Sequence, residues 1–157
     1  MKEKIKIYVI AILIPLALGG LSALLTMGNM NLYSQIVKPS FAPPAILFPI
    51  AWSVLYVLMG VSSGIICSSP ALNIKKQSAM LSYGASLFFN FFWSIIFFNL
   101  RQFLFAFIWL LAMLFFIIRT IMKYHRIKPI AAYLQIPYAL WVTFAGILNL
   151  QIWLLNR

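Results

Sequence analysis

Apolar residues fill most of this chain in five long stretches, with polar residues gathered in the short segments between them. The five stretches cover residues 7–26, 46–66, 79–99, 103–122 and 130–155. A helix needs roughly 20 apolar residues to cross a ~30 Å hydrocarbon core, so each stretch is long enough to span a membrane. The strict alternation typical of membrane β-strands is absent. The pattern predicts an all-α membrane protein, a five-transmembrane-helix bundle forming one domain over residues 1–157.

The basic residues lie outside the predicted spans or at their ends, and they are divided unevenly between the two membrane faces. Nine of the twelve Lys and Arg residues fall on the side of the N-terminus; Lys38, Arg101 and Arg157 fall on the other. We therefore expect a cytoplasmic N-terminus, with the C-terminus and the first loop outside. The basic loop at residues 123–128 is expected to set this topology and to contact anionic lipid. This placement accounts for the net charge of +11 without a nucleic-acid partner.

Groups for acid–base or metal chemistry are scarce. The chain has one carboxylate (Glu3), one histidine (His125) and one cysteine (Cys67). One Cys and one His cannot build a metal site within a single chain, so we expect no metal and no resident cofactor. Ion-coupled transporters usually place ionisable residues inside the membrane, whereas only Arg119 lies in a span here, where we expect it within a turn of the helix end. A conventional acid–base enzyme and a coupled transporter are both disfavoured.

Small residues recur at helical spacing on several spans, which favours close approach of helices. The pairs are Gly19 with Ala23 and Gly60 with Gly64. We expect them to pack within the chain. A third set, Ser78, Ser82 and Ser86, lies on one face of the third span, and we take this serine face as a candidate homodimer contact, with internal packing as the alternative.

Aromatic and amide residues occur well inside the spans, where helices are otherwise aliphatic. Trp52 and Tyr56 share one helix face, as do Asn90 and Trp93. A stripe on the fifth span holds Pro137, Trp141, Ala145, Leu148 and Asn149. Because buried amides need partners, these groups predict a shared, partly polar cavity that opens outward. The alternative is that both asparagines simply hydrogen-bond neighbouring helices.

The segment at residues 27–45 is the only long loop, and it is rich in proline and apolar residues. Prolines restrict the backbone and lower the entropy cost of ordering a segment. A long, stiff and partly apolar loop above a cavity is typical of a lid. We therefore expect this loop to be ordered and to cover the outer mouth.

Four sequence runs also resemble the TspO/MBR family of tryptophan-rich sensory and translocator proteins, which includes the peripheral benzodiazepine receptor. They are KPSFAPP at 38–44, AWSVLYVLMG at 51–60, NFFWS at 90–94 and PYALWVTFAGILN at 137–149. The likeness covers all five spans in order, and the chain looks like a bacterial member. The resemblance implies a dimeric five-helix bundle in a bacterial cell membrane, with a ligand pocket beneath the first loop.

The resemblance also implies ligands and the residues that contact them. Family members bind porphyrins such as protoporphyrin IX, and many bind synthetic isoquinoline carboxamides and benzodiazepines. Carried over by position, Trp52 and Asn90 would be polar ligand contacts. By the same resemblance, the residues lining the pocket would be Tyr33, Pro43, Tyr56, Trp93, Trp141, Phe144, Ala145 and Leu148. We add Asn149, one of the two buried amides described above, as a further candidate contact.

Some family members are reported to promote light- and oxygen-dependent porphyrin breakdown. For that reaction Trp52 and Trp141 are the candidate electron donors, because an indole near an excited porphyrin can be oxidised. The sequence departs from the cholesterol motif of mammalian members, since Leu150 and Leu154 stand at its Tyr and Arg positions. The leading interpretation is a porphyrin-binding membrane sensor, with a passive transporter of apolar solutes and a membrane scaffold as alternatives.

Overall fold

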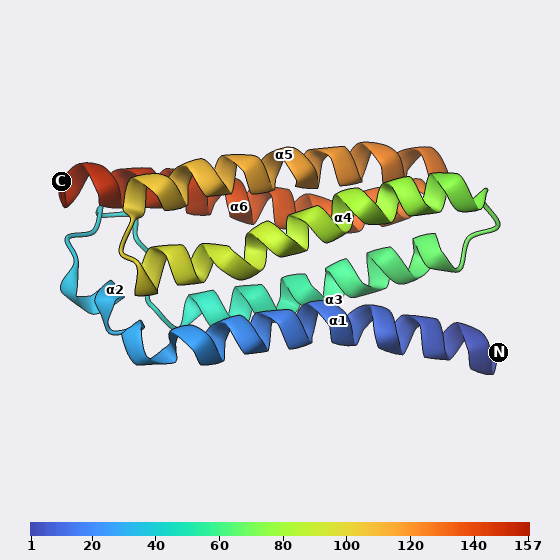
Figure 1. The fold of residues 1–157 in the computed structure, drawn as a ribbon, viewed down its shortest axis with the longest axis horizontal. Helices are drawn as coiled ribbons and strands as arrows, with labels where there is room; N and C mark the ends of the chain where they lie inside the picture. Colours follow the sequence, from blue (N-terminus) through green and yellow to red (C-terminus); the bar gives the residue numbers. More distant parts are fainter.

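The computed structural model describes residues 1–157 and consists of helices joined by short segments (Figure 1). In chain order the elements are α1 (Lys2–Thr26), η1 (Met27–Asn29), α2 (Leu32–Gln35), α3 (Leu47–Cys67), α4 (Asn73–Ser94), η2 (Ile95–Asn99), α5 (Phe103–Ile127) and α6 (Pro129–Leu155). The π-helix η2 continues α4 directly. Five helices, counting α4 and η2 as one, are long and apolar enough to cross a membrane. The predicted all-α, five-helix fold is confirmed.

The long helices lie roughly side by side and alternate in direction (Figure 1). One pair is formed by α1 and α3, and α5 packs on both α6 and α4. The N-terminus and the connections 68–72 and 128 lie at one end of the bundle, and residues 27–46, the connection 100–102 and the C-terminus lie at the other. We call the first end the basic end and the second the lid end.

Two glycines on α3 explain how tightly α1 and α3 pack in the half of the bundle near the basic end. A Cβ atom on Gly60 would collide with the backbone of Ile12, and one on Gly64 would lie 2.6 Å from the ring of Tyr8. The Gly60–Gly64 pair therefore serves packing within the chain, as small residues commonly do between membrane helices.

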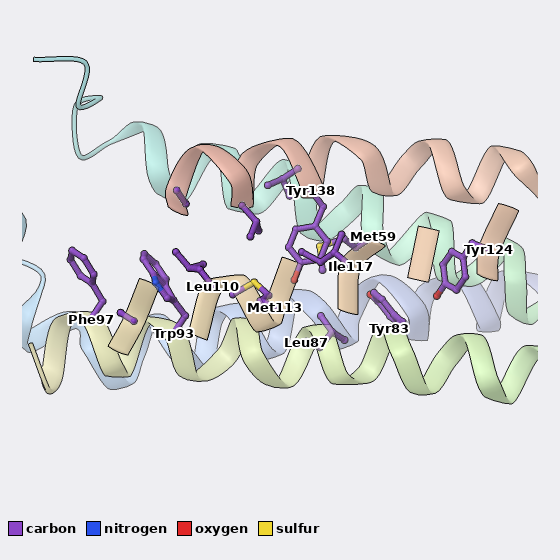
Figure 2. Packing of buried hydrophobic residues seen from close by; sticks show 14 of the residues in the cluster. Met59, Tyr83, Leu87, Trp93, Phe97, Leu110, Met113, Ile117, Tyr124 and Tyr138 are labelled. Carbon is purple, nitrogen blue, oxygen red and sulfur yellow. The ribbon is translucent and has the colours of Figure 1, made fainter. Parts of the chain in front are cut away.

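The interior is filled mainly by side chains from α3, α4, α5 and α6. Figure 2 shows Tyr83 and Leu87 projecting from α4 toward Tyr138 of α6, with Met113 of α5 between the helices. Tyr138 and Met113 are fully buried. These large side chains pack the middle of the bundle.

The helix ends near the basic end differ from the prediction. The fourth span continues as α5 to Ile127, so residues 123–127 are helical and only Lys128 separates α5 from α6. Arg119 consequently lies about two turns from the helix end rather than within one. The prediction was wrong because apolar length marks only the part inside the hydrocarbon, whereas Lys and Arg are good helix formers and favour a helix C-terminus.

The serine face of the third span lies inside the molecule, so its assignment as a homodimer contact is wrong. Ser82 and Ser86 are both buried within the single chain. The Lys123 ammonium donates hydrogen bonds to the Ser78 carbonyl (2.9 Å) and the Ser82 hydroxyl (2.8 Å), and the Tyr138 hydroxyl donates to the Ser86 carbonyl. Small residues admit a neighbouring helix from the same chain as readily as one from a second copy.

Candidate functional site

A cavity of about 350 Å³ lies in the half of the bundle near the lid end. Its walls come from α1, α3, α4 with η2, and α6, and Met30, Tyr33 and Ala45 of the lid segment (residues 27–45) also line it. Its surface is mainly apolar, and its size falls within the ~300–1,000 Å³ typical of ligand pockets. The long loop is thus ordered and covers this space.

Eight of the eleven residues predicted to contact a ligand line this cavity. They are Tyr33, Trp52, Tyr56, Asn90, Trp93, Ala145, Leu148 and Asn149. Pro43, Trp141 and Phe144 do not line it. Sequence positions far apart along the chain are therefore brought together around one space, while Trp141 and Phe144 belong to an outer aromatic layer that packs on its wall.

The outer layer is aromatic and packs against the cavity wall from outside. The Trp141 ring meets the edges of Trp52 (6.5 Å between centroids, 89° between planes) and Phe48 (5.9 Å). Phe144 packs on Trp141 and on Phe41 of the lid segment. Trp52 and Phe48 line the cavity, and Trp141 packs against both of them without lining it.

Trp52 forms part of the cavity wall together with Tyr56. The two rings stack at 5.6 Å with an interplanar angle of 25°, as residues four apart on one helix can do. The edge of Trp52 also meets Tyr138 at 6.2 Å. The result is a flat aromatic surface held in place by neighbours on α3 and α6.

A chain of hydrogen bonds joins α3, α4 and α6 beside this surface. The Tyr56 hydroxyl donates to Asn90 Oδ1 (2.9 Å), and Asn90 Nδ2 donates to the Tyr138 hydroxyl (3.2 Å). Asn90 is 7% exposed, so it has little access to other partners. Its amide fixes the spacing of three helices and still presents one unused N–H.

Asn149 plays a similar part near the lid end. It accepts a hydrogen bond from Trp93 Nε1 (3.1 Å) and donates one to the Phe103 carbonyl (2.8 Å). The sequence left two alternatives for Asn90 and Asn149, a place in a cavity or hydrogen bonds to neighbouring helices. The structure shows both, because the two asparagines bond neighbouring helices and also line the cavity. Because most of their hydrogen-bonding capacity is used, the cavity favours a largely apolar occupant.

The wall formed by α1 is the part that sequence reasoning missed. Leu16, Gly19, Gly20 and Ala23 line the cavity there, and Phe97 lines it from η2. The small pair at Gly19 and Ala23 was the available signal, but it was interpreted only as helix packing. Gly20 and Ala23 are also exposed, so the cavity reaches the protein surface beside α1.

The lid segment is held by its own hydrogen bonds. The Tyr33 hydroxyl donates to the Pro43 carbonyl (2.7 Å), which explains how Pro43 contributes without lining the cavity. Burial raises the pKa of the Tyr33 phenol above its ordinary value. The Lys38 ammonium donates to the Tyr33 carbonyl (2.6 Å) and lies 4.9 Å from the centre of the Tyr33 ring.

Two asparagines fasten the lid segment to the bundle. Asn156 accepts a hydrogen bond from the Val37 amide (3.0 Å) and donates one to the Val37 carbonyl (2.8 Å). Asn29 donates to Asn99 Oδ1 (2.9 Å), and Asn99 donates to the Leu25 carbonyl. These contacts hold the start of the lid segment, at Asn29, and its middle, at Val37.

The residues around the cavity limit what chemistry is possible there. No carboxylate, histidine or cysteine lines it, and no three His, Cys, Asp or Glu side chains anywhere in the chain are grouped to hold a metal ion. The cavity offers aromatic surfaces, two amides and indole rings. Such a site is suited to binding a flat apolar molecule and, where light or an oxidant is involved, to electron donation by an indole.

Comparison with known proteins now identifies the family. The sequence model of the TspO/MBR family matches residues 11–154. The chain belongs to the TspO/MBR family. It is 36% identical over 150 residues to the tryptophan-rich protein TspO of Archaeoglobus fulgidus, covering 94% of this chain and 95% of that one.

Relatives occur in bacteria and mammals as well. The translocator protein of Bos taurus is 33% identical over 147 residues, covering 92% of this chain and 87% of its own. Protein CrtK of Rhodobacter capsulatus is 31% identical over 124 residues, covering 79% and 78%. Family membership and five spanning helices together make this TspO/MBR chain an integral membrane protein with a sensor or receptor type of role.

Proposed function

We propose that this protein is a membrane receptor that binds porphyrins, with protoporphyrin IX as the type ligand, in the cavity at its lid end. The observation that supports this most is the stacked Trp52–Tyr56 surface, which forms one wall of an otherwise apolar cavity. Flat aromatic ligands gain most from such surfaces because offset stacking adds to the burial of apolar area. Trp52, Tyr56, Asn90, Trp93 and the other predicted cavity residues are the proposed contacts.

The size of the cavity bears on how a macrocycle would fit. At about 350 Å³ it is near the lower end of the range for ligand pockets, so a porphyrin would fill it and extend through the opening beside α1. The anionic propionates of the ligand would lie toward the lid end, where Lys38 is the cation of the lid segment. Isoquinoline carboxamides and benzodiazepines are smaller aromatic molecules, and we propose that they occupy the same space.

Light-dependent porphyrin breakdown is the proposed further activity of this site. An excited porphyrin takes one electron from an indole, and O2 adds to a carbon–carbon double bond of the porphyrin radical anion. Return of one electron to the oxidised indole leaves a dioxygen adduct, whose O–O and C–C bonds break to give two carbonyl groups and an opened macrocycle. Trp52 would be the direct donor because it lines the cavity, whereas Trp141 lies behind it at 6.5 Å and would act by passing an electron to the oxidised Trp52.

Several properties of the whole protein belong to the same proposal. The N-terminus is cytoplasmic, and the lid segment and C-terminus are outside a bacterial cell membrane, as the charge asymmetry predicts. Residues 1–157 act as a single domain. The protein forms a homodimer through a surface other than the serine face, which is internal.

Binding is tested by titrating protoporphyrin IX into the purified full chain in the dark while following tryptophan fluorescence and porphyrin absorbance. We expect saturable quenching, and we expect Trp52→Phe to lose a large share of it because this indole would touch the ligand. Trp153→Phe is the matched control, since Trp153 lies outside the cavity beside Arg157. Quenching that fails to saturate, or that falls equally in both variants, would contradict the proposal.

The photochemical step is tested by illuminating the same complexes in air. We expect Trp52→Phe and Trp141→Phe to bind porphyrin about as well as the wild type while bleaching it more slowly, with the larger effect at Trp52. Bleaching at the wild-type rate in both variants would remove the indoles from the mechanism and leave a receptor without turnover.

A further inference from the structure

Two cations of α5 lie within the bilayer-spanning part of the protein without an anion to match them. Arg119 is more than two turns from the end of α5, and Lys123 is one turn nearer to that end. The chain contains a single carboxylate, Glu3, at the start of α1. No residue of the protein can therefore serve as a counterion for either group.

The depth of Lys123 follows from its partners on α4. Its ammonium donates to the Ser78 carbonyl and the Ser82 hydroxyl, which lie roughly 10 Å along the helix from Asn73. With η2, α4 is 27 residues long, or about 40 Å, which matches a bilayer with its headgroups. The ammonium thus lies near the boundary between headgroups and hydrocarbon, where an unmatched charge is costly.

At the basic end α4 and α5 pack against each other, and Lys123 bridges them; we call this seam between the two helices the groove. On α4, Lys75 shares a face with Ser78 and Ser82 by the helical repeat. On α5, Arg126 likewise shares a face with Arg119 and Lys123.

Neither cation is saturated by the contacts it makes within the chain. Lys123 uses two of its three N–H donors. The Arg119 guanidinium lies 5.7 Å from the centre of the Phe115 ring and makes no hydrogen bond in the protein. Phe115 and Met122 beside them are more than half exposed and suited to contact acyl chains.

We propose that the groove between α4 and α5 at the basic end is a binding site for an anionic phospholipid, with its headgroup phosphate between Arg119 and Lys123. The phosphate supplies the missing negative charge and accepts the unused N–H groups, and the acyl chains lie along Phe115 and Met122. Basic grooves between membrane helices commonly recognise such headgroups. This site is separate from the cavity, and it does not depend on what the cavity binds.

The test is native mass spectrometry of the full chain released from detergent with increasing phosphatidylglycerol. The ratio of lipid-bound to free protein gives the affinity for this lipid. In Arg119→Gln/Lys123→Gln we expect binding about 30-fold weaker. Each basic residue near an anionic surface strengthens binding about fivefold, and two such residues are removed. The Gln side chain at 123 can still donate to the Ser78 carbonyl, so the helix pair keeps a polar contact.

The matched control is Lys2→Gln/Lys4→Gln. It removes the same charge from α1 at the same end of the bundle, outside the groove. We expect less than about a threefold loss there if binding is confined to the groove. An equal loss in both double variants would overturn the proposal, because it would show diffuse attraction to a basic end rather than a site.

Two further measurements separate the remaining possibilities. Arg119→Gln alone breaks no hydrogen bond of the protein, so it tests the site without risk to folding, and we expect about a fivefold loss. Phosphatidylcholine should bind much more weakly than phosphatidylglycerol. Equal binding of the two lipids, or displacement of phosphatidylglycerol by inorganic phosphate at comparable concentration, would overturn an anionic lipid as the occupant.

Discussion

Gly19 shapes the cavity because it has no side chain. A Cβ atom at this position would overlap the ring of Tyr56, which stacks on Trp52. The close approach of α1 to Tyr56 therefore depends on glycine. Its neighbour Gly20 also lines the cavity, but a Cβ atom there would meet nothing within 4 Å.

This difference predicts opposite results for two alanine substitutions. In Gly19→Ala the Tyr56 ring must move into the cavity, so we expect a loss of about 1–3 kcal/mol in stability and at least a tenfold loss in porphyrin affinity. In Gly20→Ala we expect unchanged binding and up to about 1 kcal/mol of added stability from helix propensity. Thermal unfolding measures the stability of both variants, and fluorescence titration measures their porphyrin affinity. Similar results for the two variants would show that the position of the Tyr56 ring controls neither stability nor porphyrin binding.

Residue-level reasoning from sequence succeeded where periodicity alone decides which way a side chain faces. Trp52 with Tyr56, and Asn90 with Trp93, were predicted to share faces and do so around one cavity. Trp141 was misplaced because its relation to the cavity depends on α3. Periodicity on α6 cannot show that Trp52 of α3 lines the cavity while Trp141 only packs against the Trp52 ring.

At the scale of elements, apolar length located the five helices well but not their polar ends. α3 and α6 match the predicted spans to within one residue at each end. α1, α4 and α5 run on into basic segments, which hydropathy counts as loop although Lys and Arg suit helices. The π-helix η2 also leaves no clear trace in the sequence, and yet it brings Phe97 to the cavity.

The lid segment depends on one residue at the end of α6. Asn156 makes two hydrogen bonds to the backbone of Val37, like the pairing of two strands. Both bonds are exposed, so together we assign them about 1 kcal/mol. This free energy is small enough for local opening of the lid segment without unfolding of the bundle.

Replacing Asn156 with alanine should therefore loosen the lid segment. We expect amide hydrogen exchange at Val37 and Ala42 to rise about fivefold, with porphyrin association and dissociation both faster and the unfolding temperature nearly unchanged. Asn31→Ala is the control, because the Asn31 side chain makes no hydrogen bond although it lies in the same segment. Unchanged hydrogen exchange in Asn156→Ala would mean that the other contacts of the lid segment hold it in place without Asn156.

At the scale of the whole molecule, the two ends of the bundle carry different features. The lid end has the cavity, the aromatic layers and only three cations, whereas the basic end has nine cations and tightly packed helices. Between them, Tyr138, Met59 and Met113 are fully buried in the core. Passive transport along the axis of the bundle would need this layer to move.

The charge asymmetry predicts how these ends are oriented in the membrane, and this orientation can be measured. With Cys67→Ser as background, Gln35→Cys places a thiol on the exposed surface of α2 at the lid end, and Asn73→Cys places one at the exposed start of α4. Nine cations against three predict that the basic end is cytoplasmic. In intact cells, a membrane-impermeant maleimide should label Gln35→Cys and should reach Asn73→Cys only after the membrane is opened. The reverse pattern would place the cavity toward the cytoplasm, so that its ligand would be drawn from inside the cell and the lipid site of α4 and α5 would face the outer leaflet.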